Sequence, residues 1–138
     1  MKWMTWENVG IDRMACAWLI RRFIDTEPEF LFIPRGLKPE TQPDTQPFDI
    51  PGVLLSHHRG HCTFHTMMRE YHLDDPVLLR IARIIDEADI VQDALLEPIA
   101  LGLDAVCRGI RMVSQDDYAA FKTSYPLFEG LYAYLKSD

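Results

Sequence analysis

The chain has 138 residues, 48% of them hydrophobic, and a formal net charge of −7. This length and composition fit one domain with a proper core and leave little room for a second. The negative charge excludes a general nucleic-acid surface, which needs a basic patch or stripe. No apolar run approaches the ~20 residues that span a bilayer, and the N-terminal residues lack the features of a signal peptide. The sequence therefore predicts a cytoplasmic protein without direct nucleic-acid or membrane contacts.

The first part of the chain predicts a small β-sheet. Residues 2–7 alternate as a strand does, a helix follows from Asp12 to about Asp25, and Phe30–Ile33 forms a second strand. A strand, a helix and a strand in about thirty residues predict a right-handed βαβ unit with a parallel pair. Residues 34–51 then hold five of the nine prolines. A loop this long is typical of a lid, a partner-binding segment or a partly disordered stretch, and we expect it to be mobile and to cover the site.

The rest of the chain predicts helices. Residues 63–72 form the first, and an aspartate followed by Pro76 begins the second in the usual N-cap and N1 order. A third covers residues 97–113, Ser114 caps a fourth, and Ser124–Pro126 starts the last. The predicted fold class is α+β: a small mixed or parallel sheet begun by a βαβ unit, followed by an all-helical C-terminal half.

The main chemical signal is Ser56–His65, which holds four of the five histidines and one of the three cysteines. It follows the apolar run Gly52–Leu55, predicted to be a buried strand. His61 and His65 are spaced i, i+4, and Cys62 and His65 i, i+3, so they share a face if the helix begins at His61. Imidazole and thiolate are ligands that zinc and its neighbours prefer. The alternative is that these histidines are solvated or bond to the backbone at a turn.

Three charged residues near predicted helix ends are further site candidates. Asp86 and Asp89 are spaced i, i+3 beside an apolar stripe, and buried charge is costly unless it is paired or bound to a metal. The alternative is that both mark the solvated end of the helix. Arg13 lies in the first turn of its helix, which the helix dipole disfavours. An internal salt bridge is the favoured explanation, and contact with an anion is the other.

Segments spread over nearly the whole chain form a family pattern. They are Ile11–Asp25, Phe48-Asp49, Ser56-His57 with Gly60, Cys62-Thr63-Phe64 and Leu127–Ala133. With these segments the chain resembles the C-terminal domain of the chromate-resistance protein ChrB. In that family the domain usually follows an N-terminal regulatory domain that resembles DNA-binding domains, and the full protein is linked to chromate-responsive expression. The 138 residues do not include such a domain, so a transcription-regulator function does not simply carry over.

The chain departs from the family pattern at two positions. The family usually has a glutamate where this chain has His65, and a histidine where it has Asp86, whereas the aspartate at Asp89 is retained. If both positions bind one metal ion, this exchange preserves the types of ligand and swaps their sources. The resemblance therefore links the histidine stretch to the two aspartates.

These patterns together predict one divalent metal site, made of His57, His65, Asp86 and Asp89. Mixed nitrogen and oxygen ligands suit Zn, Mn, Fe or Ni about equally, and at least one position is expected to stay open for water or an oxyanion. Arg13 is the expected anion contact and Cys62 a candidate redox partner. His58 and His61 are expected on the surface.

Three functions remain open, two that use such a site and one in which the histidines bind nothing. The domain is a sensing or binding module that recognises a metal or an oxyanion such as chromate during stress, a metal-dependent hydrolase or redox enzyme, or a scaffold that binds nothing. An enzyme predicts a substrate pocket beside the metal. A sensor predicts an exposed apolar surface or a homodimer interface that changes on binding.

Overall fold

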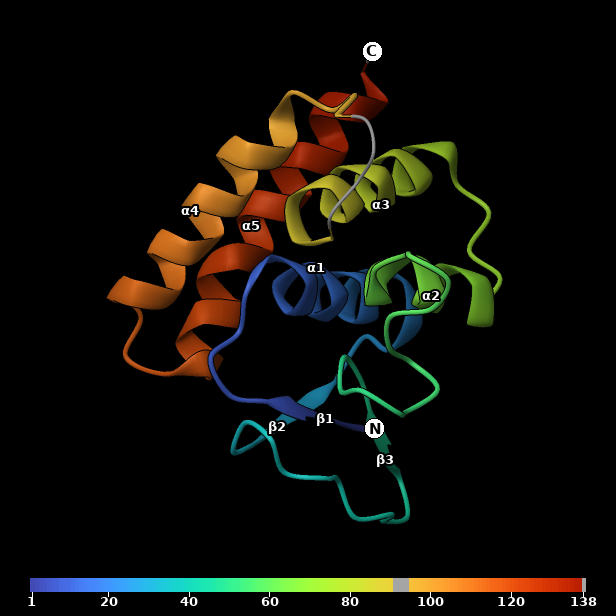
Figure 1. The fold of residues 1–138 in the computed structure, drawn as a ribbon, viewed down its shortest axis with the longest axis vertical. Helices are drawn as coiled ribbons and strands as arrows, with labels where there is room; N and C mark the ends of the chain where they lie inside the picture. Colours follow the sequence, from blue (N-terminus) through green and yellow to red (C-terminus); the bar gives the residue numbers. More distant parts are fainter. Residues whose placement is uncertain (91–94, 138) are drawn as a thin grey trace.

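A computed structural model of the protein describes residues 1–90 and 95–137. The elements in chain order are β1 (Lys2–Trp6), α1 (Ile11–Leu19), a π-helical turn η1 (Ile20–Ile24), β2 (Glu29–Ile33), β3 (Thr45–Pro47), α2 (Thr63–Glu70), α3 (Pro76–Asp89), α4 (Ile99–Val113) and α5 (Asp117–Lys136). The strands lie at one end of the molecule, α1 and α2 lie beside them, and α3 lies farther from the sheet (Figure 1). Within the described ranges, no helix is long and apolar enough to cross a membrane.

The sheet is parallel, with strand order β2-β1-β3. β1 pairs with β2 from Lys2 opposite Glu29 to Trp6 opposite Ile33. The helix between these strands completes the predicted βαβ unit. The predicted α+β class, with a small parallel sheet and a helical C-terminal half, is confirmed.

The segment between residues 34 and 55 differs from the prediction. The sequence predicts a loop at Thr45–Pro47 and a strand at Gly52–Leu55. In the structure, Thr45–Pro47 is strand β3, and Gly52–Leu55 belongs to a turn. Pro47 is tolerated because it ends an edge strand, where its missing N–H is not needed. Leu54 is 61% exposed, and Leu55 makes an isolated bridge to Phe48. Periodicity cannot separate so short an apolar turn from a strand.

α5 is one continuous helix, although the sequence predicts two with a break before Pro126. Its N-cap is Asp116, which accepts a hydrogen bond from the Ala119 amide at 2.8 Å. Proline removes the bond to the carbonyl four residues back, which here belongs to the exposed Lys122 and is open to water. Phe121 and Phe128 are buried on either side of the proline, and this packing outweighs a cost of about 3 kcal/mol.

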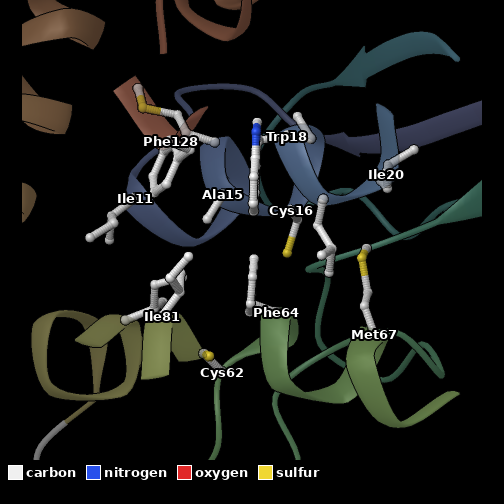
Figure 2. Close-up of a cluster of buried hydrophobic side chains, with 14 of the residues drawn as sticks. Ile11, Ala15, Cys16, Trp18, Ile20, Cys62, Phe64, Met67, Ile81 and Phe128 are labelled. Atoms are coloured by element: carbon white, nitrogen blue, oxygen red, sulfur yellow. The ribbon is translucent and has the colours of Figure 1, made fainter. Parts of the chain in front are cut away.

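The core is centred on Trp18 of α1, which is 1% exposed (Figure 2). Its ring stacks on Phe64 of α2, with centroids 6.5 Å apart, and on Phe128 of α5, 6.3 Å apart. The indole Nε1 donates a hydrogen bond to Glu129 at 2.8 Å. α1 is apolar almost all round because helices pack on more than one of its sides, and this packing fixes the position of the charged residues at its start.

We expect Phe64→Ala to lower the free energy of unfolding by about 3–5 kcal/mol, because it leaves a cavity in a well-packed core. Phe64 is fully buried, whereas Leu101 on α4 is 73% exposed. The matched variant Leu101→Ala should therefore change stability by no more than about 0.5 kcal/mol. Urea denaturation followed by circular dichroism measures both, and similar losses for the two variants would contradict this placement of the core.

Candidate metal and oxyanion site

Asp12 is a buried carboxylate that caps a helix other than its own. Its Oδ2 accepts a hydrogen bond from the Thr63 amide at 2.8 Å, and its Oδ1 one from the Phe64 amide at 3.1 Å. These are the first amides of α2, which have no partner within their own helix. The contact joins residues about fifty positions apart, and nothing in the sequence pattern indicates it.

Asp86 of α3 supports the same end of α2. Its Oδ1 accepts a hydrogen bond from the Cys62 amide at 2.7 Å, and its Oδ2 lies 2.9 Å from Nδ1 of His61. Asp86 is 6% exposed, so the alternative of a solvated helix end does not hold for it. The start of α2 is thus held by carboxylates of the protein and is not left open for an external anion.

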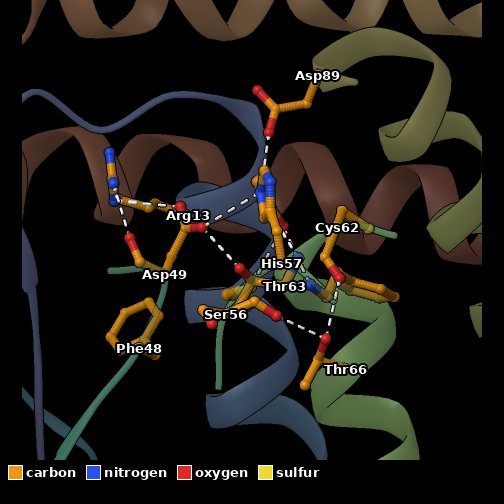
Figure 3. Close-up of polar contacts among 12 residues, drawn as sticks. Arg13, Phe48, Asp49, Ser56, His57, Cys62, Thr63, Thr66 and Asp89 are labelled. Atoms are coloured by element: carbon orange, nitrogen blue, oxygen red, sulfur yellow. Dashed lines mark hydrogen bonds and ion pairs between the residues drawn. The ribbon is translucent and has the colours of Figure 1, made fainter. Parts of the chain in front are cut away.

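His57 lies where three carboxylates converge (Figure 3). Its Nε2 is 3.0 Å from Asp12 Oδ2, 3.3 Å from Asp89 Oδ2 and 3.5 Å from Asp49 Oδ1. Asp12, His57 and Asp89 each offer one ligand atom, and these atoms all lie within 4.8 Å of one another. A single divalent ion can span such a set after small side-chain shifts, because its bonds to nitrogen and oxygen are about 2.0–2.2 Å long.

Arg13 forms the internal salt bridge that the sequence favours. Its Nε lies 3.2 Å from Asp49 Oδ2, and its Nη2 donates to the Asp49 carbonyl at 2.8 Å. Thr63 Oγ1 donates to Asp49 Oδ1 at 2.6 Å. Asp49 has a φ of +52°, which is uncommon for residues other than glycine. These bonds hold the strained backbone and aim the carboxylate at His57.

The cluster attracts positive charge. Burial, and then the charge of Asp12, raises the pKa of Asp49 to about 7. The hydrogen bond to Asp12, and then that to Asp89, raises the pKa of His57 to about 10. When the three aspartates are ionised and His57 is neutral, three negative charges and the one positive charge of Arg13 leave a net charge of −2. A divalent cation would neutralise this charge.

A cavity of about 470 Å³ opens onto the cluster. Its wall includes Asp12, His57 and Asp89, together with Arg35 from the proline-rich segment. Within residues 1–90 and 95–137, Arg35 has no ion-pair partner. The predicted lid segment therefore contributes a cation to the wall. A larger cavity of about 710 Å³ lies between β2 and α5, but its lining is mainly apolar and aromatic and includes none of these carboxylates.

The structure brings together two of the four predicted ligands, His57 and Asp89. The other two, His65 and Asp86, lie around His61, whose ring stacks on that of His65 with centroids 4.0 Å apart. His61 is expected on the surface and is indeed 45% exposed, but its Nδ1 is bound to Asp86. The sequence does not mark Asp12 and Asp49 as ligands. The one indication in the sequence that either aspartate is functional was its place in the family motifs.

Cys62 is the N-cap residue of α2 and faces the core. Its side chain is fully buried, and its thiol donates a weak hydrogen bond to the Ala82 carbonyl at 3.6 Å. Burial raises the pKa of this thiol well above its usual range. Redox chemistry needs the thiolate, which this environment disfavours.

The comparison with known proteins now identifies the family. The sequence profile of the family described as "ChrB, C-terminal domain" matches residues 3–135, nearly the whole chain. The chain belongs to this family. Protein ChrB of Cupriavidus metallidurans strain CH34 is 32% identical to the domain over 138 residues, which are 99% of this chain and 41% of that relative. The domain thus spans less than half of the relative's length, and no solved structure matches it.

We expect Asp12→Ala to lower the free energy of unfolding by about 2–6 kcal/mol, because two buried amides lose their acceptor and each unsatisfied group costs about 1–3 kcal/mol. The measurement is urea denaturation with a chelator present, so that bound metal does not contribute. Asp104→Ala is the control, since Asp104 forms an i, i+4 pair with Arg108, whose side chain is 63% exposed, and such surface pairs contribute about 0.3–0.5 kcal/mol. Equal effects would show that Asp12 does not cap α2.

In the metal-free protein we expect the imidazole of His57 to stay protonated between pH 5 and 8, because its pKa is raised to about 10. Burial lowers the pKa of His65, so His65 should titrate below its ordinary value. A pH titration followed by NMR of the imidazole carbons measures both, with His57→Gln and His65→Gln to assign the signals. A His57 signal that titrates near its ordinary value would contradict the geometry.

The same pKa shift has a consequence for stability. The pKa of His57 rises from 6.5 to about 10 on folding, so its charge stabilises the folded state fully below about pH 6.5. This contribution is lost as the pH rises through about 10. The stability difference between wild type and His57→Gln in chelator should shrink over that interval, and a constant difference would count against a charged His57.

Proposed function

We propose that the domain binds a divalent metal ion through Asp12, His57 and Asp89, and that the ion and Arg35 together bind a small oxyanion such as chromate. Membership of the ChrB family supports a role related to chromate resistance. The observation that carries the proposal is the convergence of three ligand atoms, all within 4.8 Å of one another, on the wall of a cavity. In this role the domain is a binding or sensing module.

The donor set fits a divalent ion. It consists of one imidazole nitrogen and two carboxylate oxygens, and the third carboxylate, Asp49, lies 3.5 Å from His57. Such mixed ligands suit Zn, Mn, Fe and Ni. The ion would replace the proton that His57 otherwise shares with its neighbours, and it would neutralise the net charge of the cluster. The amides of α2 bound to Asp12, and Arg13 bound to Asp49, already orient these carboxylates.

The open side of the cluster suits an oxyanion. Three protein ligands leave at least one coordination position for water or an oxygen of the ligand. The cavity of about 470 Å³ has room for a small tetrahedral anion. Arg35, which also lines this cavity, would add a charge-assisted hydrogen bond. Because α1, α3 and the segment between β2 and α2 all contribute to the wall, binding would link three parts of the chain, which is what a sensor requires.

A metal-dependent enzyme is the second candidate. Asp49 is beside the cluster without belonging to the three-ligand set, with its Oδ1 3.5 Å from His57 Nε2. A carboxylate that is not itself a ligand but lies next to an open metal position could accept a proton from a bound water. Turnover of a substrate that depends on both the metal and Asp49 would favour this candidate over simple binding.

Isothermal titration of the tag-free, chelator-treated protein with Mn²⁺ tests the metal site, since Mn²⁺ prefers oxygen-rich ligands. We expect His57→Gln and Asp89→Asn each to weaken Mn²⁺ binding by at least about tenfold. Asp104→Asn on α4 is the matched control and should bind as the wild type does. Absence of Mn²⁺, Zn²⁺, Fe²⁺ and Ni²⁺ binding, or unchanged binding in both site variants, would refute the site.

Chromate titration of the metal-loaded protein tests the second half of the proposal. We expect Arg35→Gln to weaken chromate binding by roughly three- to tenfold, the loss of a partly solvated charge-assisted hydrogen bond, with Mn²⁺ affinity unchanged. Sulfate as competitor would show whether the site selects chromate. Chromate binding that is equally strong without metal would contradict the arrangement.

A further inference from the structure

A second cluster beside the proposed site remains unused by it. The imidazole rings of His61 and His65 are stacked, with centroids 4.0 Å apart and an angle of 17° between the rings. Nδ1 of His61 lies 2.9 Å from Asp86 Oδ2. None of these three residues belongs to the group formed by Asp12, His57 and Asp89.

The cluster has ring nitrogens that are available for a ligand. With Nδ1 of His61 bound to Asp86, its Nε2 is left, and the His61 side chain is 45% exposed. In the described part of the chain, neither this nitrogen nor the ring nitrogens of His65 have a hydrogen-bond partner. Two partly exposed imidazoles at i, i+4, stacked on one another at the start of α2, thus leave nitrogens for a ligand.

The spacing of the rings suits a bridging ion. A zinc–nitrogen bond is about 2.0–2.1 Å long and follows the nitrogen lone pair, which lies in the plane of the imidazole ring. The two rings are stacked with centroids 4.0 Å apart, so they are close enough for one ion, and binding would require the side chains to rotate out of the stack so that a nitrogen of each ring reaches a common point. Asp86 occupies the position of the carboxylate that commonly binds the far nitrogen of a metal-bound histidine and orients its ring.

We propose that His61 and His65 form a second transition-metal site, with Asp86 positioning His61 behind it. Two imidazoles completed by water favour borderline ions such as Zn²⁺, Ni²⁺ or Cu²⁺ over Mn²⁺. The site shares no ligand with the first, so it does not rest on the proposed function. Asp86 also holds the Cys62 amide through its other oxygen, so the orienting carboxylate is fixed before any metal binds.

Isothermal titration with Zn²⁺ in the double variant His57→Gln/Asp89→Asn isolates the second site. We expect about one equivalent to bind there, and about two in the wild type. Adding His65→Gln should abolish the remaining equivalent, and Asp86→Asn should weaken it by about 10–100-fold, the usual effect of removing a carboxylate behind a ligating histidine. His72→Asn is the control, because His72 is exposed, lies outside both clusters and has a φ of +54° that asparagine accepts.

The outcomes separate the two sites. Absence of Zn²⁺ binding in a folded His57→Gln/Asp89→Asn variant overturns the second site, and so does binding that survives His65→Gln. Zn²⁺ binding lost on His65→Gln, with His72→Asn unaffected, supports it. If the wild type and the His57→Gln/Asp89→Asn variant both bind one Zn²⁺ equivalent that His65→Gln abolishes, and the wild type binds no Mn²⁺, Fe²⁺ or Ni²⁺ at the first site, the proposed function fails and the second site stands.

Discussion

The placement of both histidine clusters depends on the two carboxylates that cap α2. Asp12 and Asp86 each bind backbone amides at the start of this helix, and each also contacts a histidine of the preceding turn. Burying a carboxylate costs several kcal/mol, and the helix amides and dipole offset this cost. Because one set of bonds satisfies the helix and aims the imidazoles, the cap and the candidate chemistry cannot be separated. A residue that replaced either aspartate would disturb both.

The turn before α2 concentrates unusual backbone. Asp49 and Arg59 have positive φ although neither is a glycine, and strain of this kind gathers at functional sites because surrounding contacts must maintain it. Here the contacts are those of Asp49 with Arg13 and Thr63. The strained turn delivers His57 to the carboxylates of α1 and α3, and this joins the sheet end of the molecule to its helical end. A ligand in the cavity would act on that junction.

The parts of the fold that local pattern determines could be predicted, and those set by tertiary contact could not. The βαβ unit and the start of α3 at Pro76 follow from alternation, periodicity and capping residues. β3 could not be predicted, because it forms by pairing with β1 and not through strand propensity. The continuity of α5 could not be predicted either, because the packing of buried aromatic side chains outweighs the cost of Pro126. At the site, the metal-binding chemistry of imidazole and carboxylate side chains indicated His57 and Asp89. The salt bridge of Arg13 could be predicted because the helix dipole disfavours an unpaired cation in the first turn. The roles of Asp12 and His61 depend on contacts over 51 and 25 residues, which no local spacing reveals.

Trp18 has a consequence for how the chain folds. Its indole is bonded to Glu129 and stacked on Phe128, more than a hundred residues later. Contacts of such sequence separation are slow to form, because a long loop must close before they stabilise anything. The face of α1 that packs on α5 therefore stays exposed until α5 has formed, although α2 can cover the face at Phe64 earlier. Apolar surface that stays exposed in a partly folded chain favours aggregation, so the docking of α5 protects the domain as well as completing its core.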